Sequence, residues 1–206
     1  LFGPTASGKS RLAIDIAKKL DGEIVNADSM QVYKEIKILS ARSNDKSIKH
    51  HLYGFVSAKE NFSVGSWYKL AVTKIQEINK KGKVAIVTGG TGLYFKILID
   101  GLAEIPEVPK IDYSHLNLLK TKMIQSHYSK RYPKIFEGIN RNDIQRISRA
   151  ISVYEATGIT LNEWKKKKNK KYFKSSEFIK ICLIPPKTAL EERIKKRFLD
   201  MLKKGA

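Results

Sequence analysis

The run GPTASGKS at residues 3–10 constrains the fold of this chain most, because it matches the P-loop pattern G-x-x-x-x-G-K-[ST] at every specified position. In such a loop, glycines let backbone N–H groups surround a phosphate at the N-terminus of a helix. Lys9 then supplies a cation, and the Ser10 hydroxyl is a ligand for Mg²⁺. Apolar residues at four-residue spacing predict the required helix directly behind the loop: Leu12, Ile16 and Leu20. A glycine-rich turn that only caps a helix is the alternative interpretation.

Short apolar runs predict the strands of a mostly parallel sheet. The strand before the P-loop is reduced to Leu1-Phe2, and further strands are expected at 23–28, 84–88 and 178–184, the last two buried. Helices alternate with them, which indicates an α/β fold of the P-loop NTPase class with helices on both faces. Ligands of such sheets bind beyond the carboxyl ends of the strands, so Asp28 should face the P-loop crevice. An aspartate after a strand is also a common turn or cap residue, and both roles stay open.

The strand expected at 84–88 follows a helix and leads into a glycine-rich turn. Ser63 or Ser66 is expected to cap a helix that ends at Gly82. Its predicted core stripe is Trp67, Leu70, Ala71, Ile75 and Ile78. The segment GGTGLYF at 89–95 is a second glycine-rich turn from strand to helix, of the kind whose backbone approaches a ligand closely. A tight turn without a ligand fits the same residues.

Composition divides the chain into three parts. Residues 1–104 form the expected P-loop core, and Pro106 and Pro109 then break the chain before a polar, lysine-rich helical stretch. We interpret 105–140 as a small helical insertion, after which 141–206 return to the α/β core.

Two helices are expected in the returning part. The first is capped by Asn142 or Asp143, ends at Gly158 and buries Ile144, Ile147, Ile151 and Tyr154. Its Gln145, Arg146 and Arg149 lie on other faces and can hold phosphates, although a solvated basic face or an Asp143–Arg146 pair is the alternative. The last helix is expected to open with the capping box Thr188-x-x-Glu191 and to pack Leu190, Ile194, Phe198 and Met201 or Leu202. Arg193 and Arg197 share an adjoining face.

The charge balance favours a polyanionic partner. The chain has 40 Lys and Arg residues against 20 Asp and Glu, a formal net charge of +20. Six of the seven residues from Lys165 to Lys171 are lysine, which predicts a mobile surface loop that contacts RNA, or else one that is merely solvated. The single Cys182 favours a reducing compartment, so we expect the cytoplasm. No stretch is long and apolar enough for a membrane span. The start at Leu1, without an initiator Met or a leader, suggests a clipped N-terminus.

Six motifs give the chain a resemblance to a known family. They are GPTASGKS, NADSMQVYK at 26–34, HHL at 50–52, GGTGLYFK at 89–96, NDIQRISRA at 142–150 and ERIKKRFLDMLKKG at 192–205. In this order they resemble the transfer RNA dimethylallyltransferases, or isopentenyl-diphosphate:tRNA transferases, of the IPP transferase family. DSMQVYK together with GGTGLYFK is highly specific.

The resemblance implies an enzyme that moves a dimethylallyl group from dimethylallyl diphosphate to the exocyclic amine of the adenine 3′ of the anticodon. The P-loop residues would then hold the diphosphate: Gly3, Pro4, Thr5, Ala6, Ser7, Gly8, Lys9 and Ser10. The implied catalytic residues are Asp28, which takes the proton of the amine, with Thr5, Lys9 and Arg193 around the diphosphate. Mg²⁺ at Ser10 is the expected cofactor.

The resemblance also implies a transfer RNA site. Its residues would be Asp28, Ser29, Met30, Gln31, Thr91, Gln145, Arg146, Ile147, Ser148 and Arg149. The insertion at 105–140 would grip the anticodon stem-loop of a monomeric enzyme that does not bind membranes.

Two departures from the family are visible. Arg141 stands where the family usually has proline, and family members continue well beyond Gly205, so we expect a fragment that lacks a C-terminal portion. Two other functions share some of these motifs. One is a prenyltransferase acting on free adenine nucleotides, and the other is a small-molecule kinase that uses ATP.

Overall fold

The computed structural model describes the chain except residues 107, 109–122, 124–128, 131–133, 141 and 168. The chain divides into two compact units. The first combines Leu1–Gly101 with Lys171–Ala206, and the second is Leu102–Lys170. Within the described ranges, no helix combines the length and the apolar composition that crossing a membrane requires.

A parallel sheet forms the centre of the first unit, which confirms the expected α/β class. Its strands are β1 (Gly22–Asn26), β2 (His50–His51) and β3 (Val84–Thr88), in the order β2-β1-β3. Beyond β3, Phe2 forms single parallel bridges with Gly89 and with Cys182. The segment that enters the P-loop therefore lies next to the carboxyl end of β3.

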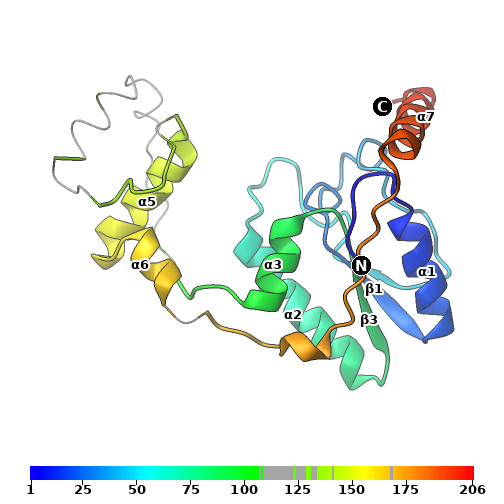
Figure 1. The fold of residues 1–206 in the computed structure, drawn as a ribbon, viewed down its shortest axis with the longest axis horizontal. Helices are drawn as coiled ribbons and strands as arrows, with labels where there is room; N and C mark the ends of the chain where they lie inside the picture. The colour runs from blue at the N-terminus through cyan, green and yellow to red at the C-terminus, as the bar shows by residue number, and fades with distance from the viewer. Residues whose placement is uncertain (107, 109–122, 124–128, 131–133, 141, 168) are drawn as a thin grey trace. The chain divides into compact units, whose positions relative to one another are not determined.

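Helices cover both faces of this sheet (Figure 1). On one face lies α1 (Lys9–Lys19), and on the other lie α2 (Val64–Lys80) and α3 (Gly92–Asp100). Ser63 caps α2 by accepting a hydrogen bond from Ser66 N at 3.0 Å, as the sequence predicted. Trp67 of α2 and Tyr94 of α3 connect these two helices, because their rings stack with centroids 4.1 Å apart.

The buried faces of α1 and α2 differ from the expected stripes. In α1 the residues with no exposure are Ala13 and Ala17, whereas Leu20 is 55% exposed. Small side chains let the helix lie close to the sheet, since a Cβ on Gly22 would be 3.4 Å from the Ala17 Cα. In α2 the buried stripe adds Tyr68 and Val72 to the predicted residues, which turns Leu70 to the edge of the face.

Two strand predictions need correction. β3 is not buried along its length, because Val84 is 42% exposed at the start of the strand. No strand forms over 178–184, where Ile179 and Ile184 are strongly exposed. This run instead pairs with Phe2 through one bridge at Cys182, in which Phe2 N donates to Ile181 O and Leu183 N donates to Phe2 O.

The C-terminal helix α7 (Lys187–Lys203) also begins differently from the prediction. Pro186 is its N-cap and no side chain caps it, so the Thr188 capping box is wrong. The proline holds φ at −53°, which starts the helix one residue before Thr188. No residue of α7 is buried, and Ile194, Phe198 and Leu202 are about half exposed. The expected packing of this helix is thus not observed among the described residues.

The second unit contains α5 (Ile144–Thr157) and α6 (Leu161–Lys166). Asp143 caps α5 by accepting from Arg146 N at 3.0 Å, and Gly158 ends it with φ at 67°, as predicted. Ile147 and Ile151 pack with Ile135 in one cluster of the unit Leu102–Lys170, whereas the sequence assigned α5 to the returning α/β core. Most of the predicted insertion at 105–140 lies outside the described residues.

Part of the lysine run is helical. Lys165 and Lys166 belong to α6, whereas the sequence predicted a mobile loop from Lys165 onward. A capping box between Thr160 and Glu163 stabilises the start of α6, and lysines in a last turn interact favourably with the helix dipole. Lys167 lies 3.8 Å from the centre of the Trp164 ring.

A buried hydrogen bond between His51 and Glu23 joins β1 to β2 and makes stability depend on pH. His51 Nε2 lies 2.6 Å from Glu23 Oε2, and the Glu23 side chain is 7% exposed. The hydrogen bond from His51 lowers the pKa of Glu23 below its usual value. A lowered carboxyl pKa gives stability that is present above the unfolded-state pKa and is lost as pH falls through the folded-state pKa.

We therefore expect Glu23→Gln to reduce the free energy of unfolding at pH 7 by roughly 1–3 kcal/mol, the cost of disturbing a buried charged partner. The difference from the parent should shrink as pH falls below about 4, because protonation removes the same carboxylate. Urea unfolding at pH 7, 5, 4 and 3 measures it, with the exposed Glu60→Gln as the control. A difference that stays constant over this range would contradict the role of the Glu23 carboxylate.

Candidate functional site

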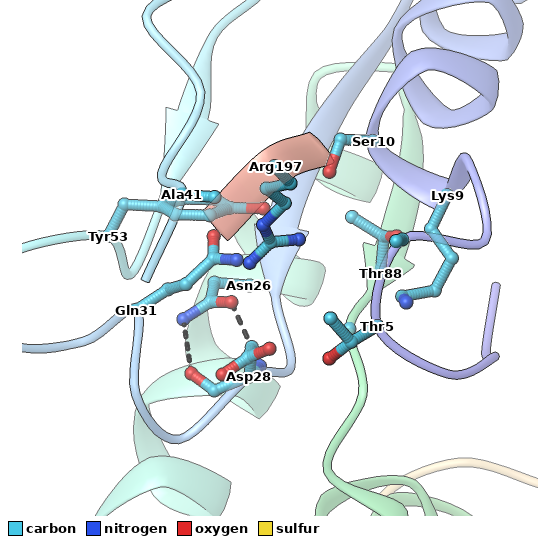
Figure 2. Close-up of a pocket in the computed structure, with 12 residues that line it drawn as sticks. Thr5, Lys9, Ser10, Asn26, Asp28, Gln31, Ala41, Tyr53, Thr88 and Arg197 are labelled. Carbon is cyan, nitrogen blue, oxygen red and sulfur yellow. Dashed lines mark hydrogen bonds between the residues drawn. The ribbon is translucent and has the colours of Figure 1, made fainter. Parts of the chain in front are cut away.

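A polar pocket lies where the P-loop meets the carboxyl ends of β1 and β3 (Figure 2). It is lined by Thr5, Ala6, Lys9, Ser10, Asn26, Asp28, Gln31, Ala41, Tyr53, Thr88, Gly89 and Arg197. The structure thus brings together the predicted P-loop residues Thr5, Lys9 and Ser10 with the predicted Asp28 and Gln31.

The P-loop has the backbone that its sequence predicts. Gly8 is left-handed with φ at 90° and precedes α1 directly. Gly3 serves packing, because a Cβ there would be 2.7 Å from Leu183 O. The ammonium of Lys9 donates to Pro4 O and, at 3.3 Å, to Ser7 Oγ. Burial lowers the pKa of Lys9, the carboxylate of Asp28 acts in the opposite direction, and the charge of Arg197 adds to the lowering.

Asp28 lies two residues beyond β1 and has two different oxygen environments. Its Oδ1 accepts a hydrogen bond from Met30 N at 2.9 Å, which is the turn contact that the sequence left open. Its Oδ2 has no hydrogen-bond partner among the described residues and would lie 3.6 Å from a Cβ built on Gly90. Asp28 is therefore both a turn residue and a carboxylate that faces the pocket.

Asn26 fixes the position of Asp28. The Asn26 side chain is fully buried, and its Nδ2 donates to Asp28 O at 2.9 Å and to Leu52 O at 3.0 Å. Its Oδ1 accepts from Asp28 N at 2.9 Å. On the other side of the sheet, Trp67 Nε1 donates to Asn26 O at 2.8 Å. These bonds hold the backbone of Asp28 against the strand end.

The second glycine-rich turn is packed against the segment that carries Asp28. A Cβ on Gly89 would lie 2.1 Å from Ala27 C and O, so only glycine fits there. Thr91 Oγ1 accepts from Ser29 N at 2.9 Å and donates to Ser29 Oγ at 3.2 Å. Two residues of the predicted transfer RNA site, Ser29 and Thr91, are therefore in contact, and Met30 beside them is 55% exposed.

Arg197 lies in the pocket lining, one helical turn beyond the predicted Arg193. Burial lowers the pKa of Arg197, and the charge of Asp28 opposes this change. The four-residue spacing of the two arginines was visible in the sequence, but which turn of α7 reaches the pocket was not. The assignment of Arg193 to the diphosphate stays a prediction.

The sequence analysis did not single out Tyr53 or Thr88. Burial raises the pKa of Tyr53 well above its usual value, with a smaller contribution from Asp28. Tyr53 directly follows the HHL motif, and that adjacency was the available signal. Thr88 is 4% exposed at the end of β3. The order of the strands, which places the end of β3 beside the P-loop, was needed to identify Thr88.

The remaining predicted residues lie on α5 in the second unit. Gln145, Arg146 and Arg149 are exposed there, and Arg146 Nε lies 3.1 Å from Asp143 Oδ2, the pair that the sequence left as an alternative. Ile147 is 1% exposed and belongs to the core of that unit. Its side chain therefore packs in the core of the second unit and is not available for contact with RNA.

Comparison with known proteins gives one consistent result. A family model described as IPP transferase matches residues 31–206. The tRNA dimethylallyltransferase of Pelagibacter ubique is 47% identical over 213 residues, which cover all of this chain and 68% of that protein. The corresponding protein of Parvibaculum lavamentivorans is 42% identical, with 67% of its length covered.

Solved structures agree. A eukaryotic dimethylallyltransferase that acts on tRNA is 28% identical and aligns with a TM-score of 0.82 over 99% of this chain and 52% of its own. The tRNA isopentenylpyrophosphate transferase of Bacillus halodurans is 30% identical, with a TM-score of 0.62, and 65% of it is covered. The P-loop and Asp28 precede the segment that the family model matches but lie within these longer alignments.

Proposed function

Because the chain belongs to the IPP transferase family, we propose that it transfers a dimethylallyl group from dimethylallyl diphosphate to the exocyclic amine of the adenine 3′ of the anticodon in transfer RNA. One observation carries this proposal: the cations of Lys9 and Arg197 line the same pocket as the carboxylate of Asp28. Figure 2 shows these three side chains converging on the space in front of the P-loop. The pocket can therefore hold a diphosphate at its cations and, beside it, an amine that gives its proton to Asp28.

The reaction divides between these groups. The amine nitrogen forms a bond to C1 of the dimethylallyl group while the bond from C1 to the diphosphate oxygen breaks. Lys9, Arg197 and the P-loop N–H groups stabilise the charge that develops on the leaving diphosphate. The Asp28 carboxylate takes the proton that the amine loses, through the Oδ2 that faces the pocket. An aromatic amine loses almost no proton at neutral pH, so this transfer accompanies the attack.

Mg²⁺ is the cofactor that we assign to this site. Ser10 lies in the pocket lining, and its hydroxyl is an oxygen ligand of the kind that Mg²⁺ prefers. Within the described residues, no cluster of His, Cys, Asp or Glu forms an all-protein metal site. Mg²⁺ held by one hydroxyl and by substrate oxygens fits these residues, and it would neutralise charge on the diphosphate.

Transfer RNA is the proposed acceptor, bound by a monomer in the cytoplasm. Ser29, Met30, Gln31 and Thr91 support this role because they surround the carboxylate that would receive the proton. The exposed Gln145, Arg146 and Arg149 of α5 offer donors and charge for RNA phosphates. The adenine must leave its stack to reach a pocket, at a cost of about a few kcal/mol.

The experiment that tests the function offers two donors and two acceptors. Purified protein receives labelled dimethylallyl diphosphate or ATP, together with unmodified transfer RNA or AMP. We expect label only in transfer RNA, and only from dimethylallyl diphosphate. Transfer to AMP would make the chain a nucleotide prenyltransferase, and phosphate transfer from ATP would make it a kinase.

The lysine-rich segment is expected to contribute uniformly to RNA binding. Changing Lys165, Lys166, Lys167 and Lys171 to glutamine should weaken all RNAs about equally and reduce the slope of log affinity against log salt by roughly 0.7–0.9 per lost contact. The measurement is RNA affinity at several salt concentrations.

The matched control removes the same charge within the first unit, at Lys18, Lys19, Lys80 and Lys81, where α1 and α2 end. If both sets weaken RNA binding equally, the lysine-rich segment acts only through its contribution to the net charge of the protein. A changed preference among transfer RNAs with an unchanged slope would contradict backbone contact.

A further inference from the structure

Thr88 has a buried hydroxyl that no group in the described part of the chain satisfies. Among the described residues, its Oγ1 is the buried side-chain nitrogen or oxygen atom that lacks a hydrogen-bond partner. Thr88 is 4% exposed and lines the pocket together with Thr5, Lys9 and Ser10. Native proteins pair nearly all such groups, so an orphan hydroxyl at a pocket points to a partner that arrives with the ligand.

The position of Thr88 in the sheet supports this view. It ends β3, and the next residue, Gly89, bridges to Phe2, which leads into the P-loop. The hydroxyl therefore stands beside the phosphate cradle, on the strand that neighbours it. P-loop NTPases use an acidic residue together with the P-loop hydroxyl to hold Mg²⁺. Here the apolar run VAIV ends in a neutral group that does not repel a polyanion.

The chemistry of the surroundings selects the partner. Lys9 and Arg197 bring positive charge, so the occupant of this end of the pocket is an anion rich in acceptor oxygens. A threonine hydroxyl can donate to such an oxygen without adding charge. Valine has nearly the same shape, and an apolar side chain in this place would leave no buried polar atom unpaired.

We propose that the Thr88 hydroxyl donates a hydrogen bond to an oxygen of the substrate's diphosphate and thereby helps to fix the leaving group between the P-loop and β3. This role rests on the proposed function, because it assumes that the pocket holds a diphosphate. Thr88 is then a binding and orienting residue in addition to the P-loop.

The test uses Thr88→Val and Thr88→Ser, with inorganic diphosphate and Mg²⁺ as the probe in titration calorimetry. We expect the valine variant to bind about 10-fold more weakly, as for loss of one hydrogen bond to a charged acceptor, and the serine variant to bind within about twofold of the parent. Thermal unfolding of the free valine variant should occur at the parental temperature or above it, because the orphan hydroxyl is gone.

The control is Thr73→Val on the exposed face of α2, where the hydroxyl donates only to Lys69 O of its own helix. Parental affinity of Thr88→Val would overturn the proposal. So would a clear fall in its unfolding temperature, which would show that the hydroxyl serves the free protein. If the parent itself does not bind diphosphate, the proposed function fails together with this inference, whereas a defect confined to the valine variant supports both.

Discussion

Replacement of Asp28 by asparagine is expected to slow the chemical step by roughly 10²–10⁴-fold while diphosphate and RNA affinities stay within a few-fold of the parent. Asparagine keeps the size of the side chain and an oxygen that can accept from Met30 N, so the turn survives. It lacks the basic oxygen that would take the proton of the amine. Single-turnover transfer with saturating substrates isolates this step.

A matched variant separates a loss of chemistry from a loss of charge. Asp15 is exposed on α1, so Asp15→Asn makes the same chemical change outside the pocket and should transfer at the parental rate. Transfer at a near-parental rate by the Asp28 variant would leave Asp28 only the role of a turn residue. Equal unfolding temperatures of all three proteins would establish that the comparison concerns the reaction.

Lys9→Ala is expected to lower the affinity for diphosphate by roughly 10–100-fold, because a charge-assisted contact to the anion is lost. The half-buried ammonium contacts only Pro4 O and Ser7 Oγ among the described residues, so truncation removes little packing. The unfolding temperature should stay close to that of the parent. Calorimetry with inorganic diphosphate and Mg²⁺ measures the change.

Lys18 provides the control, since it is an exposed lysine in the last turn of the same helix. Lys18→Ala removes an equal charge at the opposite end of α1. If both alanine variants bind diphosphate as the parent does, the P-loop has no part in holding the leaving group. If both lose affinity equally, net charge and not the position of Lys9 controls binding.

Local signals predicted the P-loop core well. The P-loop pattern, the Ser63 cap and the apolar run at 84–88 each depend on residues close together in sequence, and the corresponding elements formed with nearly the expected bounds. The carboxylate of Asp28 also reached the P-loop pocket, since parallel strands end at a common edge. These parts of the fold follow from short-range patterns combined with one rule about sheets.

The C-terminal part was predicted less well because its structure depends on distant partners. The apolar run at 178–184 has strand-like composition, but it pairs through a single bridge between Cys182 and Phe2, which is far away in the sequence. Arg197 and not Arg193 lines the pocket, although both share one face of α7, because the two residues differ by one turn along the helix axis, and spacing within one helix does not determine which turn reaches the pocket. The place of the buried Thr88 hydroxyl beside the P-loop likewise depends on strand order, which a single sequence does not state.

The hydrogen bond from Trp67 to Asn26 has a spectroscopic consequence. The chain has two tryptophans, and each unit contains one of them, Trp67 in the first and Trp164 in the second. Trp67 is fully buried, stacked on Tyr94 and bonded to the residue that anchors Asp28. Its indole is therefore a built-in fluorophore bonded to Asn26, the residue two positions before the proposed base. In a Trp164→Phe protein, the emission would report occupancy of the pocket without any attached dye.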